Sequence, residues 1–196
     1  IENFLKDKKI NFKKSQNLEK DVANFLDSNT VIGFFSGRME FGPRALCNRS
    51  ILYHCRDNSV NKWLNERLNR TEFMPFAPVT TIELADKCFK NWDPAQKSSQ
   101  FMTMTYDVTE RFKKECPAAV HVDNTARPQI VKSESNHIIH NIISYYNKTR
   151  GDLALINTSF NNHEEPIICD LNDAINSLER SNVDVLILDR CIVEKI

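Results

Sequence analysis

Apolar positions along the chain follow two different spacings, and each spacing predicts a different element. A spacing of three and four residues predicts amphipathic helices over 18–26, 60–68, 136–151 and 170–180. Short apolar or alternating runs predict strands over 31–35, 50–54, 100–108, 118–123, 128–132, 153–157, 183–189 and 191–196. Because these helices and strands do not alternate strictly, the pattern favours an α/β (α+β) fold, a mixed and twisted β-sheet covered by helices.

Capping and breaking residues mark the ends of the predicted helices. The candidate caps at helix starts are Ser15 for the first helix, Asn58 or Ser59 for the second, and Asp170 for the last. Gly151 is the stop signal of the 136–151 helix. The two prolines of "MPFAPV" end the second helix, because proline lacks a backbone donor and has a fixed φ.

The overall composition argues against several classes of function. The 196 residues carry 26 basic and 26 acidic side chains, so no net charge attracts nucleic acid or an anionic membrane, and any basic site must be local. The six cysteines form no close pair in sequence, which argues against a disulfide framework or a zinc site and favours reduced thiols in the cytoplasm. No apolar run approaches the roughly 18 residues of a membrane-spanning helix.

The start of the chain is polar and lacks a methionine. The stretch "IENFLKDKKINFKKS" is typical of a linker, and we expect residues 1–17 to be a remnant that joined a missing N-terminal domain. We expect residues 18–196 to form one domain, because no second boundary, internal repeat or low-complexity tract interrupts them.

The segment "GRMEFGPRALCNRS" (37–50) concentrates glycine and arginine. Three of the four glycines of the chain lie between positions 33 and 42, and three arginines lie in or just after the same segment: Arg38, Arg44 and Arg49. Glycine allows backbone N–H groups to approach an anion, and arginine offers a forked donor that matches phosphate or carboxylate. Phe41 and Pro43 stiffen the loop. The segment therefore predicts an anion-binding loop, with a solvated surface loop as the alternative.

Three further segments carry polar groups that suit a ligand. "NERLNRTEFMPFAP" (65–78) brings arginines to a helix end, where the helix dipole alone would also favour them. "HVDNTARPQ" (121–129) alternates its polar residues, so an extended chain would point them to one side; a solvated edge strand is the alternative. "INTSFNNHEEP" (156–166) delivers amides and hydroxyls at a strand end, where α/β folds bind ligands and where a plain Asx or Ser turn would look the same.

Together, these four segments resemble the C-terminal domain of the nodulation-type O-carbamoyltransferases, the NodU family. The family pattern reads approximately GRMEFGPRALGNRSIL, K-x-R-x-x-F-R-P-F-A-P, H-V-D-G-T-A-R-x-Q and L-N-T-S-F-N-x-x-G-E-P-I. This chain has, in the same order, "GRMEFGPRALCNRSIL", "LNRTEFMPFAP", "HVDNTARPQ" and "INTSFNNHEEPI". The match spans about 21–195, and the first motif is long enough to be highly specific.

The resemblance implies a fold, a reaction and a second domain that completes the reaction. The fold would be YrdC-like, and the domain would bind ATP, accompanied by Mg²⁺, together with carbamoyl phosphate. It would form carbamoyl-adenylate with release of phosphate and pyrophosphate. A separate N-terminal, metal-containing, kinase-like domain of the same full-length protein would then move the carbamoyl group to an acceptor hydroxyl. The family's motifs imply no nucleic-acid or membrane partner and no metal site within this chain.

The resemblance also assigns roles to individual residues. The arginines implied in catalysis are Arg44, Arg70 and Arg127. The residues implied in binding ATP and carbamoyl phosphate are Arg38, Asn48, Arg49, Ser50, His121, Asp123, Thr125, Ser159 and Asn161. Two highly charged substrates must be held together, so positioning and charge neutralisation by these groups would carry the catalysis.

The chain departs from the family pattern at several positions. Leu68 stands where the family has lysine, although Arg67 or Lys62 could supply that charge, and Met74 replaces an arginine. Three family glycines are replaced, by Cys47, Asn124 and Glu164. Asparagine tolerates a positive φ, whereas Cys47 would be strained if its backbone is left-handed. These departures keep a second function open, a nucleotide-binding or regulatory module that has lost its chemistry. Zero net charge argues against a third, nucleic-acid binding.

Overall fold

The computed structural model describes residues 1–68, 75–161, 165–180 and 183–195. Its α-helices are α1 (Glu2–Asp7), α2 (Leu18–Asp27), α3 (Val60–Arg67), α4 (Ala85–Cys88), α5 (Glu110–Glu115), α6 (His137–Arg150) and α7 (Leu171–Arg180), and its 3₁₀ turns are η1 (Lys97–Phe101) and η2 (Pro117–Ala119). Its strands are β1 (Lys13–Lys14), β2 (Ile32–Phe35), β3 (Arg49–His54), β4 (Ala77–Thr81), β5 (Tyr106–Asp107), β6 (Thr125–Ala126), β7 (Gln129–Val131), β8 (Leu155–Ser159), β9 (Val185–Leu188) and β10 (Cys191–Glu194).

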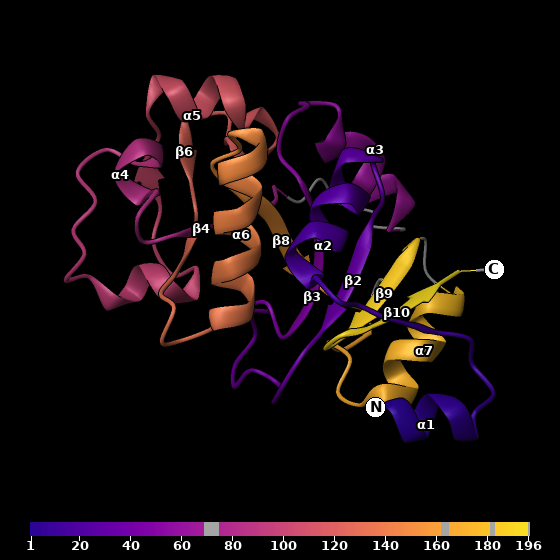
Figure 1. Ribbon diagram of the computed structural model, residues 1–196. Coiled ribbons are helices and arrows are strands. Elements are labelled where there is room, and N and C mark those ends of the chain that lie inside the picture. Colours follow the sequence, from indigo (N-terminus) through magenta and orange to yellow (C-terminus); the bar gives the residue numbers. More distant parts are fainter. Residues whose placement is uncertain (69–74, 162–164, 181–182, 196) are drawn as a thin grey trace.

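A mixed sheet forms the framework of the molecule. Its strand order is β1-β10-β9-β2-β3-β8-β4-β7, and β5 pairs separately with β6. The pairs β2–β9 and β4–β7 are parallel, and the other pairs of the large sheet are antiparallel. In Figure 1, α2 and α6 lie side by side next to the central strands, and α1 and α7 lie together beside β9 and β10. The predicted mixed sheet covered by helices is confirmed.

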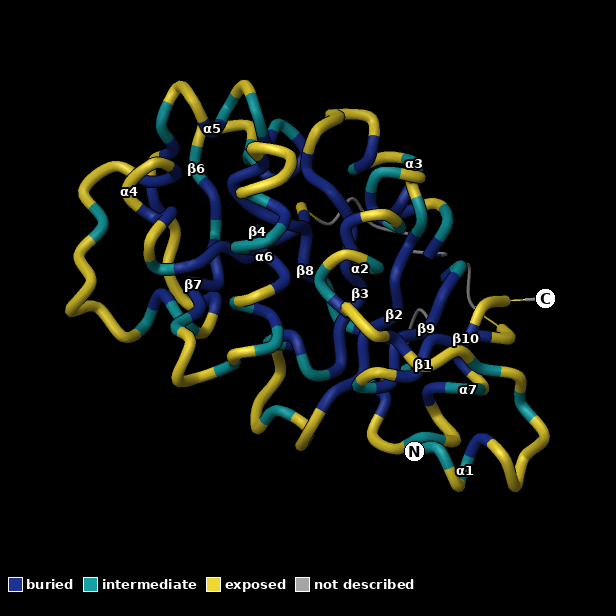
Figure 2. Tube along the Cα trace, viewed as in Figure 1, coloured by how far each residue is buried: buried dark blue, intermediate teal, exposed yellow. Residues whose placement is uncertain are grey.

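The core follows the apolar pattern of the sequence. All residues of β2, β3, β4 and β9 are buried, and Figure 2 shows these strands as a dark blue centre under largely exposed loops. The largest fully buried side chains are Tyr146, Phe34, Phe76, Phe112 and Phe160. At about 25 cal/mol per Å² of buried apolar surface, such aromatic side chains are major contributors to folding stability.

Helix ends agree with most of the predicted caps. Gly151 ends α6 with a left-handed φ of 87°, and the Asp170 carboxylate accepts from the backbone N–H of Asp173 at the start of α7. The predicted cap Ser15 is wrong. Asn17 accepts from the N–H of Lys20 and caps α2, while the Ser15 hydroxyl donates to Asp21.

Two predicted strands do not form as expected. Within 100–108, the chain first completes η1 and then gives only the two residues of β5. Within 118–123, η2 is followed by a turn in which the N–H of Asn124 donates to the carbonyl of His121. Alternation alone predicted extended chain there, but Pro117 favours a turn start and Asn124 adopts a φ of 64° that a strand cannot contain.

Residues 1–17, predicted to be a linker remnant, carry regular structure of their own. Leu5 of α1 is fully buried, and Lys13 and Lys14 pair with Ile192 and Cys191 at the edge of the sheet. The role of this segment as a connection to a preceding domain stays a prediction.

One glycine of the glycine-rich region serves the core instead of the loop. A Cβ atom at Gly33 in β2 would lie 2.8 Å from the ring of Phe160, closer than real Cβ atoms approach. Because β2 is buried, that ring has little space to withdraw. Gly33 therefore permits close packing of Phe160 on the sheet.

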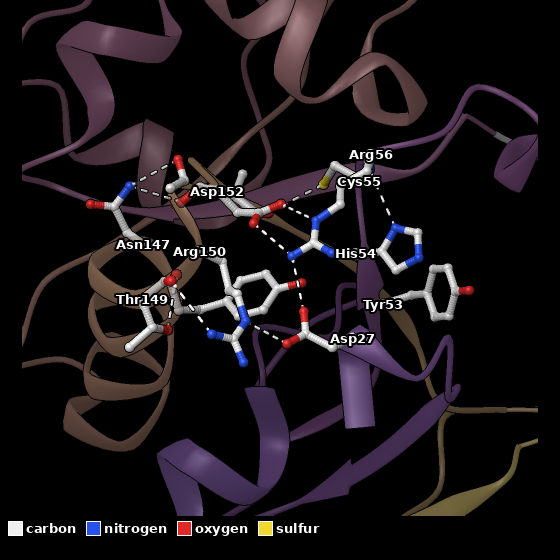
Figure 3. Close-up of polar contacts among 12 residues, drawn as sticks. Asp27, Tyr53, His54, Cys55, Arg56, Asn147, Thr149, Arg150 and Asp152 are labelled. Atoms are coloured by element: carbon white, nitrogen blue, oxygen red, sulfur yellow. Dashed lines mark hydrogen bonds and ion pairs between the residues drawn. The ribbon is translucent and has the colours of Figure 1, made fainter. Parts of the chain in front are cut away.

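A charged cluster ties α2, β3 and α6 together at one end of the sheet (Figure 3). The Arg56 guanidinium donates to both oxygens of Asp152 at 2.8 Å and to Asp27 at 3.1 Å, and Arg150 also binds Asp27. The Asp152 side chain is only 6% exposed, so its charge depends on Arg56 for compensation. The two arginines hold the pKa of Asp27 below its usual value against the effect of burial.

The neighbouring His54 makes folding stability depend on pH. Its Nδ1 accepts from the backbone N–H of Arg56, so Nε2 carries the proton and donates to Asn29 at 2.8 Å. Burial, and then the nearby Arg56 charge, lower the pKa of His54 below 6.5. Between 6.5 and that lowered pKa the unfolded chain binds more protons, so the free energy of unfolding should fall as the pH drops below about 6.5.

The His54→Gln variant is expected to lose less stability than the wild type between pH 7 and pH 5, measured by urea unfolding at both values. Some dependence should remain, because burial also lowers the pKa of His121. An identical loss in both proteins would contradict this role of His54.

Candidate anion-binding site

The motif segments meet at one end of the large sheet. The register pairs Phe35, the last residue of β2, with Arg49, the first of β3, and it pairs Ser50 with Ser159, the last residue of β8. It also places the start of β4 beside Asn157 and the start of β7 beside β4. The loop 36–48, the segment before β7 and the end of β8 therefore share one sheet end. The loop between β2 and β3 extends beyond the sheet in Figure 1.

Two arginines from different motifs line one pocket at this end. The pocket has a volume of about 500 Å³, and its lining contains Phe41, Pro43, Arg44, Leu46, Phe101, Met102, Thr103 and Arg127. This described lining contains no carboxylate. Two cations without an acidic neighbour repel each other, and an anion with several oxygens is the ligand that would relieve that repulsion.

Arg127 is the less satisfied of the two arginines. Its side chain is partly buried, and its buried Nε has no hydrogen-bond partner among the described residues. Burial, and then the positive charge of Arg44, lower the pKa of Arg127 below its ordinary value. A buried donor without a partner is costly, so this nitrogen is prepared for an acceptor that a ligand would bring.

Apolar side chains complete the pocket. Phe41 is fully exposed and Phe101 is 50% exposed, which is unusual for large apolar residues. The stiffening of the loop expected from Phe41 is wrong, because its ring does not pack on the protein. Met102 adopts a left-handed φ of 54°, a strained conformation that often accompanies binding sites.

Arg49 and Ser50 lie inside the loop structure. The Arg49 guanidinium stacks on Phe35 at 3.5 Å and donates to four carbonyl oxygens, those of Ser36, Gly37, Asn48 and Cys169. The Ser50 hydroxyl is fully buried and accepts from the N–H of Cys47. The structure thus gives both residues a role in holding the loop, and ligand contact by them stays a prediction.

Backbone N–H groups of the loop already have an acceptor. Glu40 Oε1 accepts from the N–H groups of Leu46 at 2.5 Å, Asn48 at 2.7 Å and Arg49 at 3.3 Å. The expectation that these donors face a bound anion is therefore wrong for this structure. The expected need for permissive backbone holds, because Gly37 and Gly42 have φ values of 54° and 117°.

Gln129 and Asn157 hold the loop from the sheet, and sequence reasoning missed this role. Gln129 Nε2 donates to the carbonyl of Leu46, and its Oε1 accepts from the Cys47 thiol and from Asn157 Nδ2. Asn157 Nδ2 also donates to the carbonyl of Ala45. Asn157 was expected to face a ligand at a strand end, but it is 1% exposed. Its position inside the apolar run "LALIN" was the signal that its amide is buried.

The residues of the "HVDNTAR" segment form a turn and are joined by hydrogen bonds. The extended arrangement expected from their alternation is wrong. The Thr125 hydroxyl donates to Asp123 at 2.8 Å and so accepts from His121 Nδ1 at 3.0 Å, and the backbone N–H of Thr125 also donates to Asp123. Burial is the largest influence on His121 and lowers its pKa. Arg127 follows in the same segment and reaches the pocket instead.

Ser159 and Asn161 act as a unit at the end of β8. The Ser159 hydroxyl donates to Asn161 Oδ1 at 2.6 Å, and Asn161 Nδ2 donates to the carbonyl of Glu165. Both side chains are partly exposed at the sheet end that carries the arginine pocket. Ser159 and Asn161 can therefore contact a ligand bound at this sheet end, as the family motif implies.

The remaining predicted residues are divided between surface and core. Arg38 is exposed on the loop, and Asn48 is half-buried with its Oδ1 accepting from Asn136. Arg70 and Met74 lie outside the described residues, as does Glu164.

Among the described residues, neither of the two suggested substitutes for the family's lysine lies at its position. Leu68, which occupies it, is 4% exposed in the core. Arg67 pairs with Asp184, which precedes β9 at the far end of the sheet, and Lys62 is exposed on α3. The suggestion that Arg67 supplies the missing charge is therefore wrong for this conformation.

Cys47 occupies a left-handed position, with a φ of 72°, and is fully buried. The strain expected for a non-glycine residue there amounts to roughly 1–2 kcal/mol. Cys47→Gly and Cys47→Ala both lose the thiol contact with Gln129, but only glycine relieves the backbone. We expect Cys47→Gly to be about 1 kcal/mol more stable than Cys47→Ala in urea unfolding. Equal stabilities would mean that the backbone there carries no strain.

Within the described residues, no group of three or more His, Cys, Asp or Glu side chains could hold a metal ion. Among the same residues, no helix is both long and apolar enough to cross a membrane. All six cysteines are free.

Comparison with solved structures defines the class of fold. Full-length HypF in its phosphate- and nucleotide-bound form matches with a TM-score of 0.57 and 19% identity, over 95% of this chain and 23% of that chain. HypF of T. kodakarensis matches with a TM-score of 0.55 and 14% identity, over 85% of this chain and 20% of that chain. These two matches, together with the mixed sheet and its helices, confirm the predicted YrdC-like fold.

Comparison of sequences defines the family. The model of the Carbamoyltransferase C-terminus family matches residues 23–195, and the chain belongs to that family. An uncharacterized protein of Methanocaldococcus jannaschii is 38% identical over all of this chain and 37% of its own length. Nodulation protein NolNO of Sinorhizobium fredii is 34% identical over 95% of this chain and 27% of its own length. The chain thus spans only about a third of the length of these curated relatives.

Proposed function

We propose that this carbamoyltransferase C-terminal domain binds ATP and carbamoyl phosphate at the sheet end that carries Arg44 and Arg127, and that it forms carbamoyl-adenylate there. The single observation that supports the proposal most is the pair of arginines in a pocket whose described lining contains no carboxylate. Phosphate oxygens are the acceptors that such a pair fits, and the partnerless Nε of Arg127 supplies one ready donor.

The proposed chemistry needs one water molecule to balance. Water attacks carbamoyl phosphate, and the bond between the carbamoyl oxygen and the phosphorus breaks. The products of this step are phosphate and carbamate. A carbamate oxygen then attacks the α-phosphorus of ATP, and the bond to the β-phosphoryl oxygen breaks. The products are carbamoyl-adenylate and pyrophosphate.

The residues of the chain would act mainly by position and charge. Arg44 and Arg127 would hold phosphoryl oxygens and stabilise the charge that develops when pyrophosphate leaves. The bonded pair Ser159 and Asn161 would orient the nucleotide from the end of β8. Mg²⁺ would arrive with the nucleotide and screen its phosphates, because the described residues offer no ligand cluster of their own.

The acceptor chemistry is proposed to belong to another part of a longer protein. The curated relatives are about three times as long as this chain, so they have room for a further domain. We propose that such an N-terminal, metal-containing, kinase-like domain moves the carbamoyl group to an acceptor hydroxyl. We propose a cytoplasmic location, where ATP is available.

Two measurements, made one after the other, test the proposal. Titration with ATP and Mg²⁺ should raise the melting temperature, because a ligand at a hundredfold excess over its Kd stabilises the folded state by roughly 2.7 kcal/mol. The domain should then exchange labelled pyrophosphate into ATP only when carbamoyl phosphate is supplied. The absence of a response to both ATP and carbamoyl phosphate would refute the binding site.

A second candidate is a nucleotide-binding module without chemistry. The burial of Leu68 favours it, because the family's lysine position here faces the core and supplies no charge. Binding of ATP without pyrophosphate exchange would favour this module over the enzyme. Leu68→Lys, the obvious attempt at rescue, is expected to destabilise the fold because it places a charge in the core.

A further inference from the structure

The loop 36–48 contains its own anion. Glu40 extends its carboxylate to the far side of the loop, where one oxygen accepts from the three backbone N–H groups of Leu46, Asn48 and Arg49. Successive N–H groups that converge around a left-handed residue form an anion-binding concavity of the backbone. Here the left-handed residue is Cys47, and the carboxylate of Glu40 fills the concavity.

The surroundings of the Glu40 carboxylate suit a charged group at this position of the loop. The second oxygen, Oε2, is buried and has no hydrogen-bond partner among the described residues. The charge of Glu40 lies close enough to act on both Cys47 and Arg49. The guanidinium of Arg49 is itself held by loop carbonyls, so it supplies a fixed positive charge beside the carboxylate.

The closed loop determines where Arg44 lies. Arg44 stands between Glu40 and the first N–H group that Glu40 binds, at Leu46. The carbonyls of Ala45 and Leu46 are held by Asn157 and Gln129, and Gln129 is two residues beyond Arg127. Glu40 therefore closes the loop from one side, and the two amides fix it to β8 and to the start of β7, just after Arg127.

We infer that Glu40 is a positioning residue that acts as a built-in counter-anion, closing the loop so that Arg44 and Arg127 face one pocket before any ligand arrives. The two cations repel each other, and an open loop would let Arg44 move away into solvent. Preorganisation of this kind reduces the ordering cost of binding. The inference rests on the proposed function only where ATP affinity is the readout.

The test is chemical rescue of Glu40→Ala. This variant removes the carboxylate but keeps the three backbone N–H donors, so a small carboxylate such as formate can bind them and close the loop again. We expect ATP affinity to fall by about tenfold, the loss of roughly one charge-assisted contact. A titration with formate should restore it, while chloride at equal ionic strength should not. Glu134→Ala, at an exposed glutamate, is the matched control and should behave as the wild type.

A second readout does not require any nucleotide. Cys47 is fully buried in the closed loop, whereas Cys169 is exposed. Labelling with N-ethylmaleimide, located by mass spectrometry, should therefore modify Cys169 in every variant but Cys47 only in Glu40→Ala. Formate should restore the protection of Cys47. If the wild-type chain binds no ATP, the proposed function fails, and this labelling still decides the role of Glu40.

Two outcomes would overturn the inference. Protection of Cys47 together with unchanged ATP affinity in Glu40→Ala would show that the loop closes without the carboxylate. A rise in ATP affinity that formate then reverses would show that Glu40 competes with the ligand. If Glu40→Ala does not fold, Glu40→Gln decides the matter, because wild-type labelling and affinity in that variant would show that the charge is dispensable.

Discussion

Arg127→Met is expected to lower ATP affinity roughly ten- to a hundredfold, while the melting temperature of the free domain stays the same or rises. The first effect follows from the loss of a charge-assisted hydrogen bond to phosphate, which contributes about 1.5–3 kcal/mol. The second follows from the environment of Arg127, because its partly buried guanidinium has an unsatisfied Nε and a like charge nearby. Methionine fills the same space without either cost.

Arg180→Met is the matched control for this experiment. Arg180 pairs with Glu165 at 3.1 Å on the surface, where the arginine side chain is 67% exposed, so its removal should change neither affinity nor stability by much. Calorimetric titration with ATP and thermal unfolding of both variants provide the comparison. Equal ATP affinities in Arg127→Met and Arg180→Met would mean that the pocket is not the phosphate site.

Arg56→Met is expected to have the largest effect on stability, a loss of about 3 kcal/mol in the free energy of unfolding. In a chain of this size such a loss corresponds to a melting temperature lower by roughly 6–12 °C. The cause is the carboxylate of Asp152, which is 6% exposed and would lose its bidentate partner while it stays buried. The cluster, drawn in Figure 3, lies beyond the end of β3, whereas the arginine pocket lies at the sheet end where β3 begins.

Two further variants separate this mechanism from a general loss of charge. Arg111→Met removes an exposed pair with Glu115 and should cost no more than about 0.5 kcal/mol. Arg56→Met combined with Asp152→Asn should be more stable than Arg56→Met alone, because no uncompensated charge is then buried. ATP affinity, measured at a temperature where all variants are folded, should be unchanged throughout. A double variant less stable than Arg56→Met would contradict the mechanism.

The sequence predicted the core of the fold well because the core elements carry strong periodic signals. The helix over 136–151 and the strands over 31–35 and 50–54 bury continuous apolar faces, and the structure has them within a residue or two. The failures lie where local backbone geometry competes with alternation. Met102 and Asn124, both left-handed, interrupt segments that alternate like strands. Such conformations leave little trace in a hydrophobic pattern.

For the candidate site, motif reasoning identified the segments but could not assign directions to their side chains. It expected the polar groups of the loop to face a ligand, yet the fold turns Arg49, Ser50 and Asn157 inward, where they hold the loop. It also passed over Glu40 and Gln129, because an acid in a basic motif and an amide after a proline have no obvious partner in sequence. The partner of Gln129 lies 83 residues away in sequence, at a contact that the register of the sheet creates, whereas Glu40 accepts from N–H groups six to nine residues further along the chain.

The glycine at position 33 has a consequence for sequence variation at the site. The ring of Phe160 rests against Gly33, and Phe160 is the residue between Ser159 and Asn161. A methyl group in β2 would displace that ring and, through it, the two side chains at the end of β8. Gly33→Ala is therefore expected to shift Ser159 and Asn161, the proposed nucleotide contacts, although β2 lies two strands away from β8 in the sheet.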